Sequence, residues 1–175
     1  DFGTGLLSLS GMKDIPAEAI LFDMYYAAMD PVPLAGELRA LPVVEIKPIN
    51  ETTPVFRNIK ISNVYCNGAG KGIFIRGLPE MHVKDIILEN MVLQTNKGID
   101  IQEATGISFR NIEMLSKEYN PLIDITQSDN LVFENIRYTE NVELLFRING
   151  DRSHQINIKK TNASRAKKSI AFELG

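Results

Sequence analysis

The 175 residues of this chain are enough for one domain with a sizeable core, and their mixed charge, net −3, includes no basic stripe that would favour nucleic acid as a partner. The single cysteine, Cys66, excludes an intrachain disulfide, and we expect it to be a small core residue. The longest apolar runs are short and broken by charges, so the sequence predicts no membrane partner.

The start of the chain contains two short segments, Leu6–Met12 and Ala19–Asp23, that predict two strands forming one coil. Two tyrosines, Tyr25 and Tyr26, follow directly. The next segment, Ala27–Pro54, holds five prolines and little periodicity, so we expect a long loop that leaves the regular structure. Loops of this length are uncommon unless they are functional or disordered.

From Val55 onward a phrase of nine residues recurs, first as NIKISNVYC. It alternates apolar and polar residues, and a period of two over a short run is typical of β-strands. The sixth residue is asparagine in the first four copies, whereas the fifth copy has Lys160 there. The five copies are Asn58–Cys66, Asp85–Leu93, Gly106–Met114, Asn130–Tyr138 and Gln155–Ala163.

A second short apolar strand follows each copy of the phrase. Strand pairs that repeat every 21 to 27 residues with no helix between them predict an all-β fold, a parallel β-helix forming a single domain over residues 1–175. Inward isoleucine, leucine and phenylalanine would form continuous rows, and the asparagines would stack at a bend as a hydrogen-bonded ladder. The second strands are Gly72–Gly77, Gly98–Gln102, Leu122–Thr126, Leu144–Ile148 and Ser169–Glu173.

The two ends of this solenoid differ in composition. The last coil, about residues 155–175, is rich in lysine and arginine, and we expect it to be a polar cap, because an open coil exposes an unpaired strand edge. Anion binding by the same side chains is the alternative. The first coil has no comparable charges, so we expect a head-to-head homodimer through the N-terminal face. The basic residues of the last coil are Lys159, Lys160, Arg165, Lys167 and Lys168.

Three stretches resemble the C-terminal part of bacterial polygalacturonase-like enzymes, glycoside hydrolase family 28. They are Asp14–Tyr26 with the sequence FDMYY, Thr53–Leu93 with the sequence GLPEM, and Asn96–Met114. The resemblance covers almost the whole chain from Asp14. It implies a right-handed parallel β-helix, truncated at its N-terminal side, that hydrolyses α-linked galacturonic acid in pectin with inversion. It also implies polygalacturonate or another pectic oligosaccharide as partner, no cofactor or metal, and a secreted or periplasmic location.

The catalytic motifs of that family are absent from this chain, which has no Asp-Asp pair and no Gly-His-Gly. Arg165-Ala-Lys167 matches the family's Arg-x-Lys motif only in its letters. In the family these motifs precede the FDMYY coil, so we expect a segment that is inactive alone and has no catalytic residue of its own. The resemblance places Tyr26 or Tyr25 on the sugar-binding wall, with Asp23 beside them. The alternative is a tyrosine that packs the long loop against the coil.

Asp100 and Asp124 occupy equivalent places in successive coils, so we expect them to point outward about 5 Å apart at the backbone. Paired carboxylates can carry out glycoside hydrolysis. In the resembling family, however, the catalytic coil has aspartates where this chain has Lys97 and Asn120-Pro121. An exposed stack of like charges is therefore our interpretation, and the sequence places no cationic partner beside it.

Two further functions stay open at this point. One is a non-catalytic carbohydrate-binding or scaffold β-helix, for which Tyr25, Tyr26 and Phe74 are the plausible outward aromatic residues. The other is a different enzyme that uses Asp100 and Asp124.

Overall fold

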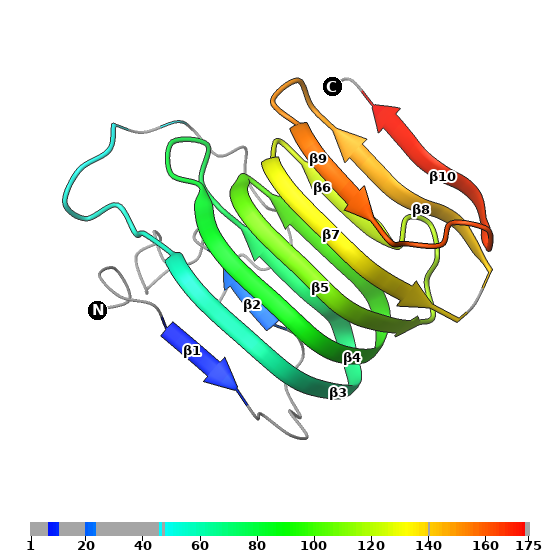
Figure 1. Cartoon of the computed structure of the whole chain (residues 1–175). Coiled ribbons are helices and arrows are strands. Elements are labelled where there is room, and N and C mark those ends of the chain that lie inside the picture. The colour runs from blue at the N-terminus through cyan, green and yellow to red at the C-terminus, as the bar shows by residue number, and fades with distance from the viewer. Residues whose placement is uncertain (1–6, 11–19, 24–45, 47, 140, 174–175) are drawn as a thin grey trace, which may run out of the picture.

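The computed structural model describes residues 7–10, 20–23, 46, 48–139 and 141–173. All regular structure in this part of the chain is β, and its parallel strands stack as a β-helix of about five turns (Figure 1). No helix among these residues is long and apolar enough to cross a membrane. The predicted fold class is therefore confirmed.

Two sheets run along the β-helix, and each coil contributes one strand to each sheet. The first sheet contains β1, the first halves of β3 and β4, then β5, β7 and β9; the second contains β2, the second halves of β3 and β4, then β6, β8 and β10. The strands are β1 (Leu7–Ser10), β2 (Ile20–Asp23), β3 (Arg57–Arg76), β4 (Val83–Gln102), β5 (Ala104–Ser116), β6 (Ile123–Thr126), β7 (Asp129–Tyr138), β8 (Val142–Asn149), β9 (His154–Lys159) and β10 (Ala166–Glu173).

The core lies between the two sheets and is built from rows of identical or similar side chains. In the first sheet Leu88 is in register with Phe109, and Phe109 with Phe133. The rings of Phe109 and Phe133 stack with centroids 4.7 Å apart, and Phe146 from the second sheet meets Phe133 edge-on at 5.2 Å. Because stacking in register buries every inward residue on both sides, these three rings are fully buried. Cys66 is buried and free, as predicted.

The asparagine column forms the predicted ladder at a bend within the strands of the first sheet. Asn135 Nδ2 donates to Asn111 Oδ1 at 2.9 Å, Asn111 Nδ2 to Asn90 Oδ1 at 3.0 Å, and Asn90 Nδ2 to Asn63 Oδ1 at 3.4 Å. All four residues have φ between 52° and 59°, in the left-handed region, which asparagine tolerates better than most residues. Lys160 takes the same backbone conformation at the end of the column, with φ 51°.

A second column of left-handed residues, which sequence reasoning missed, lies within the first three residues of the strands of the first sheet, with φ between 51° and 68°. Its members begin the five copies of the phrase, so their composition was the available signal: asparagine, aspartate, glycine and glutamine, with no β-branched residue. They are Asn58, Asp85, Gly106, Asn130 and Gln155.

Several predictions concern residues outside the described part of the chain. Tyr25, Tyr26 and most of the Ala27–Pro54 loop lie there, as does the N-terminal side of the first coil, so the loop boundaries and the homodimer stay predictions. The described end of the loop, residues 48–54, contains no strand. Asp23 ends β2, and its backbone is in register with Arg76 of β3.

The last coil is regular but poorly buried. β9 and β10 stand at the two ends of the strand order, and most of their side chains are exposed or half-buried. Phe172 continues the inward row of Ile125 and Ile148, yet its side chain is 73% exposed. The coil predicted as a polar cap therefore presents apolar side chains as well as charges.

Candidate functional site

The outer face of the second sheet carries a row of side chains from four successive coils. Phe74 of β3 is in register with Asp100 of β4, which is followed by Asp124 of β6 and Arg147 of β8. Their chain neighbours on either side are buried isoleucine and phenylalanine side chains, so strand alternation directs this row outward. The predicted outward stack of Asp100 and Asp124 is therefore confirmed.

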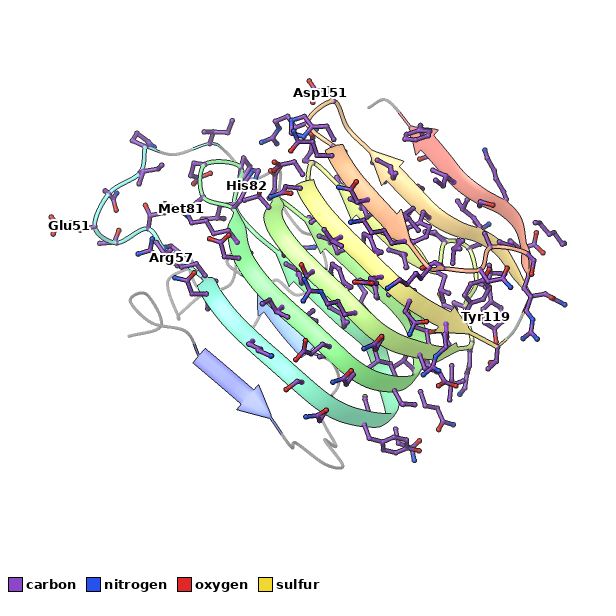
Figure 2. The ribbon with its side chains drawn as sticks, in the orientation of Figure 1. Glu51, Arg57, Met81, His82, Tyr119 and Asp151 are labelled. Atoms are coloured by element: carbon purple, nitrogen blue, oxygen red, sulfur yellow. The ribbon has the colours of Figure 1, made fainter. Side chains whose placement is uncertain are left out.

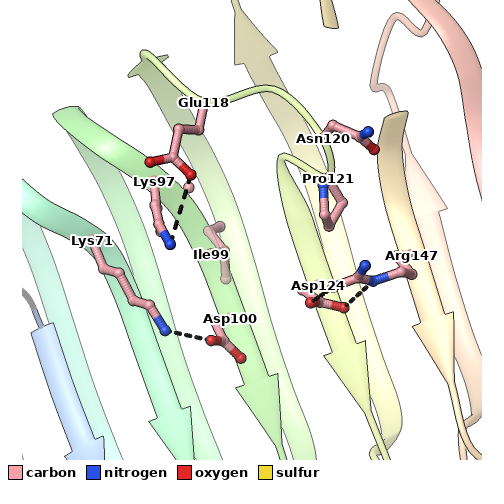
Figure 3. Close-up of a pocket in the computed structure, with 10 residues that line it drawn as sticks. Lys71, Lys97, Ile99, Asp100, Glu118, Asn120, Pro121, Asp124 and Arg147 are labelled. Carbon is pink, nitrogen blue, oxygen red and sulfur yellow. Dashed lines mark hydrogen bonds and ion pairs between the residues drawn. The ribbon is translucent and has the colours of Figure 1, made fainter. Parts of the chain in front are cut away.

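A pocket of about 190 Å³ opens over this row (Figure 3). The connection between β5 and β6 forms one wall, and strands from four successive coils, β3, β4, β6 and β8, form the floor. Lys97, Asn120 and Pro121 are brought together here. The lining residues are Lys71, Lys97, Gly98, Ile99, Asp100, Glu118, Asn120, Pro121, Asp124 and Arg147.

Asp124 is held by donors from the next coil. Its Oδ1 accepts hydrogen bonds from Arg147 Nε at 3.0 Å and from Asn149 Nδ2 at 3.1 Å, and its Oδ2 contacts a terminal nitrogen of the same guanidinium. This bidentate contact is the geometry in which arginine binds carboxylates most strongly. The hydrogen bond with Asp124 raises the pKa of Arg147 above its ordinary value, so the guanidinium stays charged at every physiological pH.

Asp100 has a cationic partner of a different kind. Lys71 Nζ lies 2.5 Å from Asp100 Oδ2 and also sits 4.1 Å above the ring centroid of Phe74. The guanidinium carbon of Arg76 lies 4.9 Å from the same centroid. Phe74 is thus outward, as predicted, but its ring is covered by two cations and is poorly suited to stack on a sugar.

The sequence placed no cation beside the two aspartates, but the structure gives each of them one. Lys71 and Arg147 pair with them because side chains from adjacent coils come within hydrogen-bond reach once the coils stack. Aligning the second strands would have found Arg147, which falls in the same column as Asp124. Lys71 lies outside that alignment, and it reaches Asp100 diagonally across one coil.

The pocket carries equal numbers of both charges, with three cations and three carboxylates among its lining residues. Lys97 and Glu118 form its mouth, where their charged atoms are 3.7 Å apart and more than half of each side chain is exposed. Such a pocket offers many donors and acceptors for a polyhydroxylated ligand. Since Asp100 and Asp124 are both bonded to cations, it does not offer a free acid and base.

A second polar cluster lies at another bend and contains both histidines of the chain. His82, which Figure 2 labels, has its Nε2 3.1 Å from Glu103 Oε2, and Arg152 contacts the other oxygen of Glu103 at 2.7 Å. Asp129 lies 4.0 Å from the Nδ1 atoms of His82 and His154. No group of histidine, cysteine, aspartate and glutamate among the described residues is arranged to hold a metal ion.

Comparisons of the chain with family models, with curated proteins and with solved structures found no match. The predicted substrate-binding residues Tyr25 and Tyr26 lie outside the described residues. Asp23 is placed by its backbone only, at the end of β2 in the second sheet. That sheet also carries the pocket, so β2 and the pocket belong to the same sheet.

Proposed function

We propose that this chain is the β-helix segment of a pectin-acting glycosidase, and that it binds an acidic sugar chain along the outer face of the second sheet without cleaving it alone. The polygalacturonase-like stretches and the parallel β-helix support this proposal. The observation that carries it is the pocket, in which Lys97 and Asn120 stand where the resembling family has aspartates.

The chemistry of the pocket suits uronic acids. Lys97 at the mouth is the most accessible of its cations and can receive a sugar carboxylate, while Lys71 lies deeper, with its side chain 34% exposed. Asp100 keeps one carboxylate oxygen that accepts no hydrogen bond in the described structure, so it can accept one from a sugar hydroxyl.

Hydrolysis needs groups that this pocket does not provide. An inverting glycosidase uses one protonated carboxyl group as acid and a second carboxylate that activates a water molecule. Here Asp124 accepts hydrogen bonds from Arg147 and Asn149, and Asp100 is paired with Lys71. The pocket is therefore assigned to binding, and its residues are given no catalytic role.

Titration of the chain with trigalacturonate, followed by calorimetry, tests this assignment. Lys71→Met should weaken binding about tenfold, equivalent to about 1.4 kcal/mol. Lys60→Met is a matched control, because Lys60 forms a similar inter-coil ion pair with Glu89 on the first sheet. The lysine side chains of the two pairs are almost equally exposed, and so are the two carboxylate side chains. Absence of binding, or equal losses in the two variants, would contradict the proposal.

A non-catalytic carbohydrate-binding domain is the second candidate, and the charge balance of the pocket favours it. A site with as many carboxylates as cations has no net preference for an acidic sugar. The fully methyl-esterified trisaccharide separates the two functions. Binding equal to that of trigalacturonate would support a general carbohydrate-binding domain and contradict a site specific for uronic acids.

A further inference from the structure

Positive charge is concentrated in the last coil of the chain. The stretch Arg152–Phe172 contains six of the 19 lysine and arginine residues and none of the 22 aspartate and glutamate residues. It therefore has a formal charge of +6 in a chain whose net charge is −3. A local excess of this size creates a positive potential even though the whole molecule is acidic.

Five of these cations, here called the basic corner, lie around the connection between β9 and β10. Two come at the end of β9 and just after it, one from the connection, and two near the start of β10. Figure 1 shows this connection as a short link at one edge of the β-helix. The basic corner consists of Lys159, Lys160, Arg165, Lys167 and Lys168.

The basic corner differs from earlier coils in how its charges are paired. Lys60 and Lys71 each meet a carboxylate from the next coil, and neither is more than about one-third exposed. Lys159 and Lys168 form no hydrogen bond or ion pair within the described residues. Lys160 pairs with Glu134, and Lys167 pairs with Glu143. Both lysines remain accessible, since their side chains are 75% and 71% exposed. Such exposed pairs are weak and can exchange partners readily.

An apolar platform accompanies the charges on β10. Register with β8 places Lys168 over Leu144, Ile170 over Phe146 and Phe172 over Ile148, so all three project from the same side of the strand. The Phe172 side chain is 73% exposed. A cation and an exposed ring on one strand can bind a sugar carboxylate and stack on the apolar face of a sugar ring.

We propose that the basic corner, with Phe172, is a second binding surface for a polyuronate chain, separate from the pocket on the second sheet. This inference rests on the proposed function, since it takes the same acidic polysaccharide as ligand. A lysine binds a carboxylate through a point charge on a flexible side chain, so it can follow the carboxylates of a flexible polymer. Nucleic acid is a poorer fit, because single-stranded chains are bound on a series of stacking aromatics and Phe172 is the only exposed phenylalanine among the described residues.

Gel electrophoresis of the chain through polygalacturonate measures binding to the polymer. The Lys159→Gln, Lys168→Gln double variant should weaken this binding about fivefold or more, and added salt should weaken the parent's binding, because the contacts are exposed charges. Arg110→Gln, Arg137→Gln is the matched control, as both side chains are exposed, both lie outside the basic corner and the pocket, and the change in net charge is the same. It should alter binding less than about twofold.

Trigalacturonate, which the pocket is proposed to bind, separates this inference from the proposed function. If the Lys159→Gln, Lys168→Gln variant binds the trisaccharide like the parent but loses the polymer, the corner is a separate surface. If the trisaccharide does not bind and the polymer still depends on Lys159 and Lys168, the pocket assignment fails and the corner stands. Unchanged polymer binding in this variant, or stronger binding of duplex DNA than of polygalacturonate, would overturn the inference.

Discussion

Asn111 shows how one residue meets two physical requirements at the bend of a coil. Its backbone is left-handed, with φ 52°, and its side chain both donates to Asn90 and accepts from Asn135. Glycine would satisfy the backbone alone, and glutamine would reach the ladder less well from this conformation. The repetition of asparagine in the column is explained by these two demands together.

Replacing this asparagine should separate the two contributions. We expect Asn111→Ala to lower the free energy of unfolding by about 1–2 kcal/mol, because it combines a strained φ with the loss of exposed hydrogen bonds. Asn111→Gly should lose less, since glycine accepts the backbone conformation. Urea denaturation followed by circular dichroism measures both. An alanine variant as stable as the parent would mean that the ladder adds little to stability.

At the scale of the strand, stability depends on registered rows of inward side chains. Phe109 has a row neighbour on each side, Leu88 and Phe133, and none of the three is accessible to solvent. A change at this position disturbs three consecutive coils, because each coil contacts its neighbours along the whole strand.

A polar side chain in this row should be strongly destabilising. Phe109→Asn buries an amide without partners and removes the stacked ring, so we expect a loss of about 3–5 kcal/mol. Thermal melting followed by circular dichroism measures it. Arg110→Asn, at the adjacent exposed position on the outer face of β5, is the control. If the two variants melt within a few degrees of each other, the inward register of β5 is wrong.

Alternation and the recurring phrase were enough to predict the strands, their stacking and the asparagine ladder. Each of these depends on positions that are fixed within the recurring phrase, so a single sequence is enough to predict them. The ion pair of Lys71 with Asp100 could not be predicted in the same way. Lys71 is in register with Lys97, three residues before Asp100, so its long side chain crosses between coils at an angle that the alternation does not fix. The pairing of Arg147 with Asp124, by contrast, could have been predicted by aligning the repeats.

At the scale of the whole molecule, two surfaces are proposed to bind an acidic sugar, and the described part of the chain contains no free acid and base pair. We predict that the purified chain releases no reducing ends from polygalacturonate above the rate in buffer. The assay should include Asp100→Asn, whose rate should equal that of the parent. Release by the parent that disappears in Asp100→Asn would instead establish a hydrolase that uses Asp100 and Asp124.

The asparagine ladder also gives the β-helix an electrical direction. Every amide in it donates toward the N-terminal coil, so the side-chain dipoles add along the axis as peptide dipoles do in an α-helix. Its negative end is the oxygen of Asn135, and the next residue of the column is Lys160, whose Nζ is 2.7 Å from Oε1 of Glu134, the chain neighbour of Asn135. The lysine that breaks the column in the sequence thus stands where a cation opposes the accumulated dipole.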